Sequence, residues 1–175
     1  MRVLIDACLL YPTVLRELLL RVAARGDFTP LWSERILEEW ARAARRAGPE
    51  VEAQARVEIA LARDRFPQAL VVAPLRDDLH LPDPDDVHVL SAALEGRAEV
   101  LLTRNLKDFP TRTLSPLGVY PRAPDPVLME LHAARSLADE VEAVRATAER
   151  LSGESQPLRP LLKRAGLPRL AKALS

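Results

Sequence analysis

Short runs of aliphatic residues alternate along this chain with longer stretches in which Leu, Val and Ala recur at helical spacing. The runs at residues 2–5 (RVLI), 69–73 (ALVVA) and 98–102 (AEVLL) have the length and composition of buried strands, and residues 117–120 indicate a short edge strand. Because strands that are connected through helices pair in parallel, this alternation predicts an α/β fold. We expect a central parallel sheet covered by helices on both faces.

The helical patterns are long enough to account for most of the chain. They cover residues 9–24, 33–48, 50–65, 86–95, 127–151 and 157–174. Ser33 is a suitable N-cap, and Glu34 then lies in a first turn, where a negative charge is favourable. Since the strand patterns stop near residue 120, we expect a sheet-containing domain at residues 1–122. Residues 123–175 are expected to form a helical C-terminal extension that packs on this domain or on a partner.

The overall composition limits the class of protein. A length of 175 residues, with 48% hydrophobic and 29% charged residues, is that of one globular domain with a real core and not of a disordered chain. No apolar run is long enough to cross a membrane and no secretion signal precedes the first strand, so we expect a cytoplasmic location. The single cysteine, Cys8, excludes an intramolecular disulfide and a metal site built on cysteines.

Charge is unevenly distributed, although the formal net charge is zero. Residues 76–86 hold five Asp and one Arg, a density of negative charge that attracts cations. Residues 156–175 hold five Lys or Arg and no acid. This basic tail is either a solvated helix face or a surface that contacts phosphates or an acidic partner.

Asp6 directly follows the first strand. Functional groups of parallel sheets gather at the carboxyl ends of the strands, so this position is a candidate site. A carboxylate in such a buried place is costly unless it is neutralised, and a metal ion is the usual remedy. The alternative is structural: Asp6 could cap the following helix by accepting a hydrogen bond from the amide of Cys8 or Leu9.

The helix that begins after Ser33 offers three glutamates. Its apolar face is formed by Ile36, Leu37, Trp40 and Ala44. Glu38 lies nearly opposite this face and is expected to be solvated, whereas Glu39 and Glu34 lie at its two flanks. A carboxylate at the flank can reach over the edge of the core, so Glu39 is the first candidate for a functional role and Glu34 the second.

The segment LPDPDDVHVL, residues 81–90, opens the next helix. Pro84 suits the first helical position, with Asp83 as N-cap and Asp86 in the first turn. This explains two of the three aspartates by structure alone. Three carboxylates within four residues nevertheless repel one another, and a magnesium or manganese ion, which prefers oxygen ligands, relieves that repulsion.

The segment TRNLKDF follows a strand and carries Thr103, Arg104, Asn105 and Asp108. Its hydroxyl, amide and carboxylate groups can bind a cation directly or through water, and Arg104 is placed for a phosphate contact. Ordinary turn chemistry is the alternative, because Asn and Asp are common in turns.

Several acids held together suit phosphodiester cleavage. Divalent ions clamped by carboxylates activate a water molecule and stabilise the leaving oxygen. The sequence has no Gly-rich phosphate loop, which argues against an NTPase or a dinucleotide enzyme, and no GxSxG or HExxH motif. A haloacid-dehalogenase-type phosphatase requires a second Asp two residues after Asp6, where this chain has Cys8.

The order of these motifs resembles the PIN-domain family. The matching motifs are VLID with Asp6, ILEEW with Glu39, DPDDVHVLSAAL with Asp86, and TRNLKDF with Thr103 and Asn105. Over roughly residues 1–120 the chain is similar to bacterial VapC-like PIN proteins. The resemblance implies a Rossmann-like α/β/α sandwich and an endoribonuclease that depends on Mg²⁺ or Mn²⁺. It also implies the toxin of a toxin–antitoxin pair, with RNA as substrate, a cognate antitoxin as partner and in many members a homodimer.

The resemblance carries roles over to particular residues. It implies catalysis by Asp6, Glu39 and Asp86, metal binding by Asp6, Asp86 and Asn105, and an RNA contact from Thr103. Asp83 is our candidate for a further metal ligand, and Arg104, beside Asn105, is our candidate for a phosphate contact with RNA. Two positions depart from the family: Cys8 stands where Asn is frequent, and Asn105 stands where many members have a fourth Asp, for which Asp108 could substitute. An amide keeps an oxygen ligand but loses a charge. The alternative function is therefore a catalytically weakened PIN-fold module that binds RNA or a protein partner.

Overall fold

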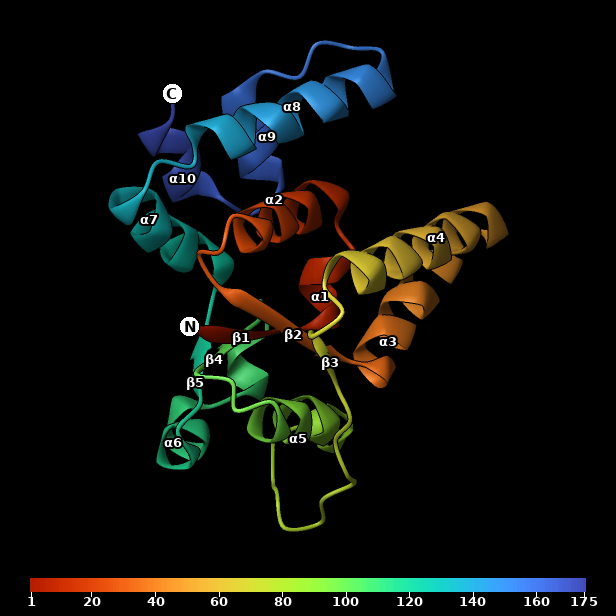
Figure 1. Ribbon diagram of the computed structural model, residues 1–175, viewed down its shortest axis with the longest axis vertical. Helices are drawn as coiled ribbons and strands as arrows, with labels where there is room; N and C mark the ends of the chain where they lie inside the picture. The colour runs from red at the N-terminus through yellow and green to blue at the C-terminus, as the bar shows by residue number, and fades with distance from the viewer. The chain divides into compact units, whose positions relative to one another are not determined.

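The computed structural model describes residues 1–175 and contains one sheet of five parallel strands. The strands are β1 (Arg2–Ile5), β2 (Thr29–Ser33), β3 (Leu70–Val71), β4 (Val100–Leu102) and β5 (Tyr120–Arg122), in the order β3-β2-β1-β4-β5. Helices flank this sheet, with α5 and α6 on one side of it and α1 on the other (Figure 1). The expected α/β/α architecture with a central parallel sheet is therefore confirmed.

The strand order reverses between β1 and β4. The chain moves outward from β1 to β2 and β3, then crosses back and continues with β4 and β5. Leu4 of β1 pairs with Leu31 of β2 on one side and with Leu101 of β4 on the other. At such a point the connections that follow the two adjacent strands run in opposite directions, which leaves a crevice beyond the carboxyl ends of the strands. In this class of sheet, ligands usually bind in that crevice.

The chain contains thirteen helical segments, ten of them α-helices. The α-helices are α1 (Ala7–Leu10), α2 (Thr13–Ala24), α3 (Glu34–Arg45), α4 (Pro49–Arg65), α5 (Val87–Glu95), α6 (Thr111–Leu114), α7 (Pro124–Ala134), α8 (Ala138–Ser152), α9 (Leu158–Arg164) and α10 (Pro168–Ala173). Short 3₁₀ turns cover Pro84–Asp86, Leu106–Asp108 and Ser115–Leu117. None of the helices combines the length and the apolar character needed to span a lipid bilayer.

Two compact units divide the chain. The first consists of residues 1–11 and 28–122 and holds the whole sheet, and the second consists of residues 12–27 and 123–175. Helix α2 thus groups with the C-terminal helices, where it packs against α8. A split of the sequence at residue 122 alone does not describe this division, because a segment from the N-terminal part of the chain belongs to the helical unit.

Polar contacts between its own elements stabilise the helical unit. Arg25, which follows α2, donates to Asp27 at 2.5 Å and to Glu140 of α8 at 2.8 Å. Asp125 of α7 is 7% exposed and accepts hydrogen bonds from the backbone amides of Arg169 and Leu170, at 2.8 and 3.1 Å. These bonds satisfy the first free amides of α10, so they account for a buried acid by structure alone.

The sequence patterns missed β2. Its run TPLWS contains Pro30, and a proline within such a run argues against a central strand. Pairing of β2 with β3 begins only at Trp32, whose amide donates to the carbonyl of Ala69. Pro30 lies before that point, where β2 is not yet paired with β3. The amide hydrogen that proline lacks is therefore not needed for a hydrogen bond between these two strands.

Candidate active site

Asp6 lies at the carboxyl end of β1, beside β4, and is 7% exposed. Its Oδ2 accepts a hydrogen bond from the Oγ1 of Thr103 at 2.7 Å and one from the Sγ of Cys8 at 3.3 Å. The side chain occupies the N-cap position of α1 but makes no capping hydrogen bond. Helix capping therefore does not explain this buried carboxylate, and its side-chain partners hold it at the point where the strand order reverses.

Thr103 follows β4 and is completely buried. Its hydroxyl donates to Asp6 and accepts from the backbone amide of Asn105 at 3.0 Å. Because the amide can only donate, the hydroxyl hydrogen is directed at the carboxylate. Thr103 therefore fixes one oxygen of Asp6.

Cys8 is a half-buried thiol at the second position of α1, and its sulfur contacts both Asp6 and Thr103. Burial, followed by the negative charge of Asp6, raises the pKa of the Cys8 thiol to about 12. The group is thus protonated at neutral pH and acts as a weak donor toward the carboxylate. A thiol here supplies the same kind of contact as the amide of an asparagine.

Three aspartates, Asp83, Asp85 and Asp86, lie directly before the N-terminus of α5. The Oδ1 of Asp83 accepts from the amide of Asp85 at 2.9 Å, which confirms Asp83 as an N-cap followed by Pro84. Asp86 is half-buried and makes no capping hydrogen bond. Capping therefore explains Asp83 and leaves Asp86 without a structural role.

The electrostatic surroundings of Asp86 bring the acids of separate elements together. The pKa of Asp86 is raised to about 6, mainly by burial and then by the negative charges of Asp83, Asp6, Asp108 and Glu39, in that order. These groups come from β1, α3, the loop before α5 and the turn after β4. We call these five residues the acidic cluster. The four surrounding carboxylates make ionisation of Asp86 less favourable, as unneutralised like charges do.

Glu39 is the member of the acidic cluster that α3 contributes. Its Oε1 lies 2.7 Å from the Nε2 of His88 and 3.6 Å from the Nε of Arg35. His88 is only 9% exposed in its side chain and comes from α5. A contact from each of two helices thus fixes the carboxylate of Glu39.

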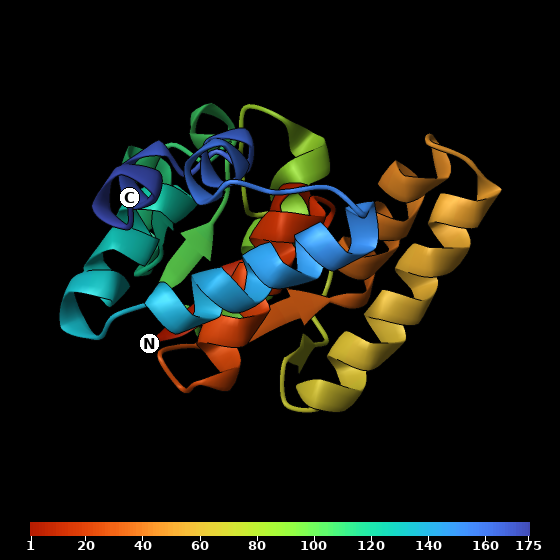
Figure 2. The same cartoon turned by 90° about the horizontal axis from the view of Figure 1, so that it is seen from above.

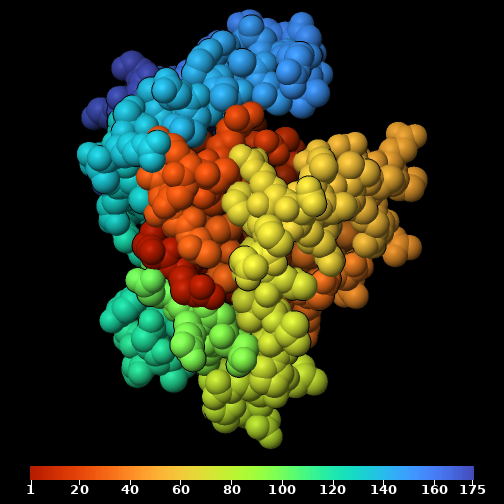
Figure 3. Space-filling view, in the orientation of Figure 1, coloured from red at the N-terminus to blue at the C-terminus, as the bar shows by residue number.

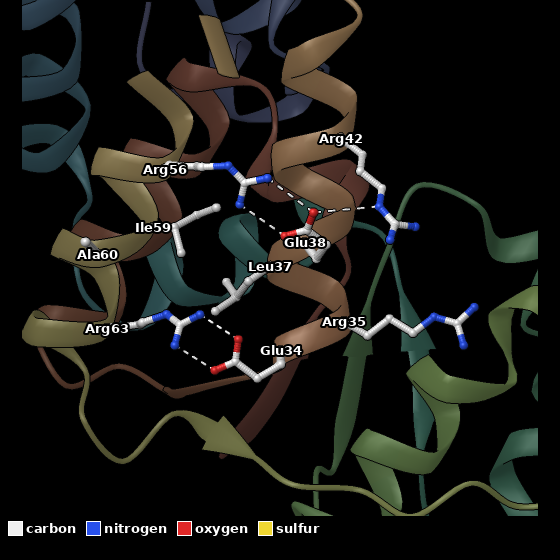
Figure 4. Close-up of a pocket in the computed structure, with 9 residues that line it drawn as sticks. All are labelled: Glu34, Arg35, Leu37, Glu38, Arg42, Arg56, Ile59, Ala60 and Arg63. Atoms are coloured by element: carbon white, nitrogen blue, oxygen red, sulfur yellow. Dashed lines mark hydrogen bonds and ion pairs between the residues drawn. The ribbon is translucent and has the colours of Figure 1, made fainter. Parts of the chain in front are cut away.

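The other two glutamates of α3 face α4 instead. Glu34 forms a bidentate pair with Arg63, and Glu38 forms one with Arg56 at 3.1 and 3.2 Å. Figure 4 shows both pairs bridging a groove of about 820 Å³ between the two helices, with Arg35 pointing away from α4. Helix α4 lies beside α3 throughout (Figure 2), so these acids serve helix packing and are separated from the acidic cluster.

The turn after β4 holds the last expected site residues. Arg104 and Asn105 are both exposed, whereas Asp108 is half-buried and is one of the charges that act on Asp86. The backbone of Asn105 is fixed by Thr103 on one side, and its carbonyl accepts from the amide of Asp108 on the other. The negative charge that Asn105 lacks is thus present nearby in the sequence, at Asp108.

Comparison with known proteins identifies the family. The model of the PIN domain matches residues 2–107, which is more than half of the chain and includes four members of the acidic cluster. The chain belongs to the PIN-domain family. The part of the PIN domain that is matched ends before Asp108, and the helices after residue 122 lie outside it.

One curated relative of this PIN-domain protein is a short match. Over 45 residues this chain is 47% identical to "Putative ribonuclease VapC50" of Mycobacterium tuberculosis (strain ATCC 25618 / H37Rv). The match covers 26% of this chain and 27% of the relative, so the chain spans about a quarter of the protein it resembles. No solved structure matches.

The acidic cluster of this PIN domain was tested for its fit to a divalent cation. All its ligand atoms are carboxylate oxygens, the donors that Mg²⁺ and Mn²⁺ prefer, and the raised pKa of Asp86 indicates repulsion that a cation relieves. In the present arrangement no three side chains of His, Cys, Asp or Glu converge closely enough to hold an ion between them. The cluster therefore fits a hard cation by chemistry and charge, through few direct protein ligands, as Mg²⁺ usually binds.

Proposed function

We propose that this PIN-domain protein is a divalent-metal-dependent endoribonuclease, which hydrolyses phosphodiester bonds of RNA. The observation that carries the proposal is the grouping of Asp86 with four further carboxylates at the reversal point of the sheet, where burial and these charges raise its pKa to about 6. Membership of the PIN-domain family and the name of the relative VapC50 support the same reaction class.

The proposed ligands of Mg²⁺ or Mn²⁺ are Asp6 and Asp86, with Asp83 and Asn105 as further oxygen donors. Asp108 is a charged alternative to Asn105, since it acts on Asp86 and Asn105 is exposed. When bound, the cation supplies a Lewis acid for the phosphate and a more acidic water. Asp6 is suited to the first contact because Thr103 and Cys8 hold one of its oxygens.

The side chains around the cluster have separate roles in the proposed reaction. Glu39, oriented by His88 and Arg35, accepts a proton from the attacking water. Thr103 orients Asp6, and its buried position makes it a positioning residue for RNA binding and not a direct contact. Arg104 is exposed beside the cluster and contacts a phosphate of the RNA backbone.

The proposed biological context is that of a toxin in a toxin–antitoxin pair. The name of VapC50 motivates this, and the proposal includes a cognate antitoxin as protein partner, a homodimer and a cytoplasmic location. Expression of the wild-type chain alone is expected to arrest bacterial growth. Growth that continues with well-folded, abundant protein would remove the toxin role without touching the nuclease chemistry.

The decisive experiment is cleavage of a panel of single-stranded and hairpin RNAs with Mg²⁺, Mn²⁺ or EDTA. Wild type is compared with an Asp6→Asn/Asp86→Asn double variant and with Asp85→Asn, an exposed acid of the same loop whose charge is not among the four that raise the pKa of Asp86 most. We expect metal-dependent cleavage by wild type and Asp85→Asn, and none by the double variant. RNA binding without cleavage in any metal would instead favour the weakened binding module.

A further inference from the structure

A cavity of about 290 Å³ lies next to Glu39 and has no part in the proposed chemistry. It lies between α3, α5 and the loop of residues 72–83, which Figure 3 shows in yellow to yellow-green on the surface. A second hollow of about 230 Å³ shares Arg35, Pro74, Leu75 and His88 with it. The two together are large enough for a planar heterocycle and its sugar, and they open at the carboxyl ends of β2 and β3.

Two buried polar atoms along this cavity have no partner. Ser91 is 2% exposed and His88 is 9% exposed in its side chain, and both line the cavity from successive turns of α5. The Oγ of Ser91 and the Nδ1 of His88 are buried without a hydrogen bond. A buried polar group without a hydrogen bond is costly, so two of them in residues that line one cavity point to a ligand that satisfies them.

The walls of the cavity indicate the chemical class of this ligand. They are built largely from aliphatic and proline side chains: Pro74, Leu75, Leu79, Pro84 and Val87. The two arginines at the cavity are already paired, Arg35 with Glu39 and Arg76 with Asp78, and the acidic cluster lies next to it. An anion is therefore a poor occupant, whereas a neutral, flat ring with polar edges fits both the apolar walls and the two unpaired atoms.

We propose that this cavity binds one unpaired nucleobase of the RNA substrate, with Ser91 and His88 forming hydrogen bonds to its polar edge. The guanidinium of Arg35, half exposed at the mouth, stacks on the face of the base, as arginine does in single-stranded RNA recognition. This inference rests on the proposed nuclease function. Because His88 also contacts Glu39, the bound base occupies a fixed position next to the cleaved bond, and the cavity gives the enzyme a sequence preference.

The test measures binding in EDTA, so that it does not depend on cleavage. Fluorescein-labelled uridine heptamers are used in which one position at a time is A, C, G or abasic, and affinity is read by anisotropy. In wild type, removing the base at one position is expected to weaken binding about tenfold, equal to about 1.4 kcal/mol. In Ser91→Ala this contrast is expected to fall below about threefold while the melting temperature stays constant or rises, because an unsatisfied buried hydroxyl has been removed.

Ser115→Ala is the matched control, since it makes the same substitution in the same unit outside the cavity and should keep the tenfold contrast. Leu75→Ala, at a position that is 93% exposed, removes part of the wall without a risk to folding and should lower the contrast as well. No base-dependent position in wild type, or an unchanged contrast in both cavity variants, would overturn the inference. The inference would also be overturned if ribose 5-phosphate competed with the labelled RNA for binding and free nucleosides did not. Wild type that discriminates bases but never cleaves would instead reject the nuclease and keep the cavity.

Discussion

Acidic side chains on the two sides of α3 lie in opposite electrostatic surroundings. Toward α4, the guanidinium of Arg56 lowers the pKa of Glu38 through a bidentate hydrogen bond. Toward α5 and the strand ends, burial and four neighbouring carboxylates raise the pKa of Asp86 to about 6. A single helix thus borders one set of acids that is paired with arginines and one set whose negative charges repel one another.

The largest expected effect separates these two sets by activity. Asp86→Asn should reduce RNA cleavage by more than about 100-fold, since loss of residues merely supporting a metal ligand already costs 10–100-fold. Glu38→Gln should leave cleavage within about twofold of wild type, because its partner Arg56 lies on the other side of the helix. Initial rates at saturating Mg²⁺ measure both, and circular dichroism verifies the fold of each variant. Equal losses in both variants would remove the distinction between the two sides of α3.

A smaller loss is expected from Thr103→Val, which keeps the shape of the side chain and removes the hydroxyl that holds Asp6. We expect cleavage to fall about 10–100-fold, with a weaker apparent affinity for Mg²⁺ or Mn²⁺. Thr103→Ser retains the hydroxyl and should recover most of the activity. A purely structural role predicts that both variants follow their melting temperatures, whereas a positioning role predicts that only Thr103→Val changes the metal concentration required.

The site residues show which parts of such a structure can be predicted from sequence. Asp6 and Thr103 follow strand patterns that stand out as aliphatic runs, and parallel pairing alone places their ends together. The helical wheel also separates Glu39 from Glu38, because the direction of a side chain on a helix follows from its spacing. These inferences succeed because each depends on the geometry of one element or of one adjacent pair.

The parts that sequence did not predict depend on contacts between distant elements. His88 is an ordinary helix residue until α3 is packed beside α5, which brings it to Glu39. Whether Asn105 or Asp108 turns toward the cluster depends on a single 3₁₀ turn that no propensity resolves. Likewise, the expected single helix over residues 9–24 is interrupted at Pro12, and its second half joins the helical unit.

The self-repulsion of the acidic cluster can be measured as stability. The pKa of Asp86 is raised in the folded chain from 3.8 to about 6, so the stability it contributes is present below pH 3.8 and is lost as pH rises through 6. In EDTA at pH 7, Asp86→Asn should therefore stabilise the protein. For a fully buried group, this increase in pKa corresponds to a change of about 3 kcal/mol in the free energy of unfolding. The partial exposure of Asp86 reduces the expected change to about 1 kcal/mol.

This change corresponds to an increase of about 2–4 °C in melting temperature for a chain of this size. The increase should disappear near pH 4, where the wild-type carboxyl is protonated, and saturating Mg²⁺ should reverse it because wild type alone then gains the binding energy. Asp85→Asn, which removes an exposed acid from the same loop, should show neither behaviour. A destabilised Asp86→Asn in EDTA at pH 7 would mean that the cluster is not self-repelling.

The smallest effect on stability is expected for Glu38, on the side of α3 that faces α4. Its contribution to stability changes with pH in the direction opposite to that of Asp86. Because Arg56 lowers the pKa of Glu38 below 4.5, the pair contributes stability above that pH, and the contribution is lost as pH falls through the lowered value. Both side chains are exposed, so Glu38→Gln should lower the melting temperature by less than about 2 °C at pH 7, and by still less in 1 M salt. Differential scanning calorimetry at pH 7 and pH 4 compares this variant with Asp86→Asn. If the two variants shifted the melting temperature in the same direction at pH 7, the cations of α4 would not account for the difference between the two sets of acids.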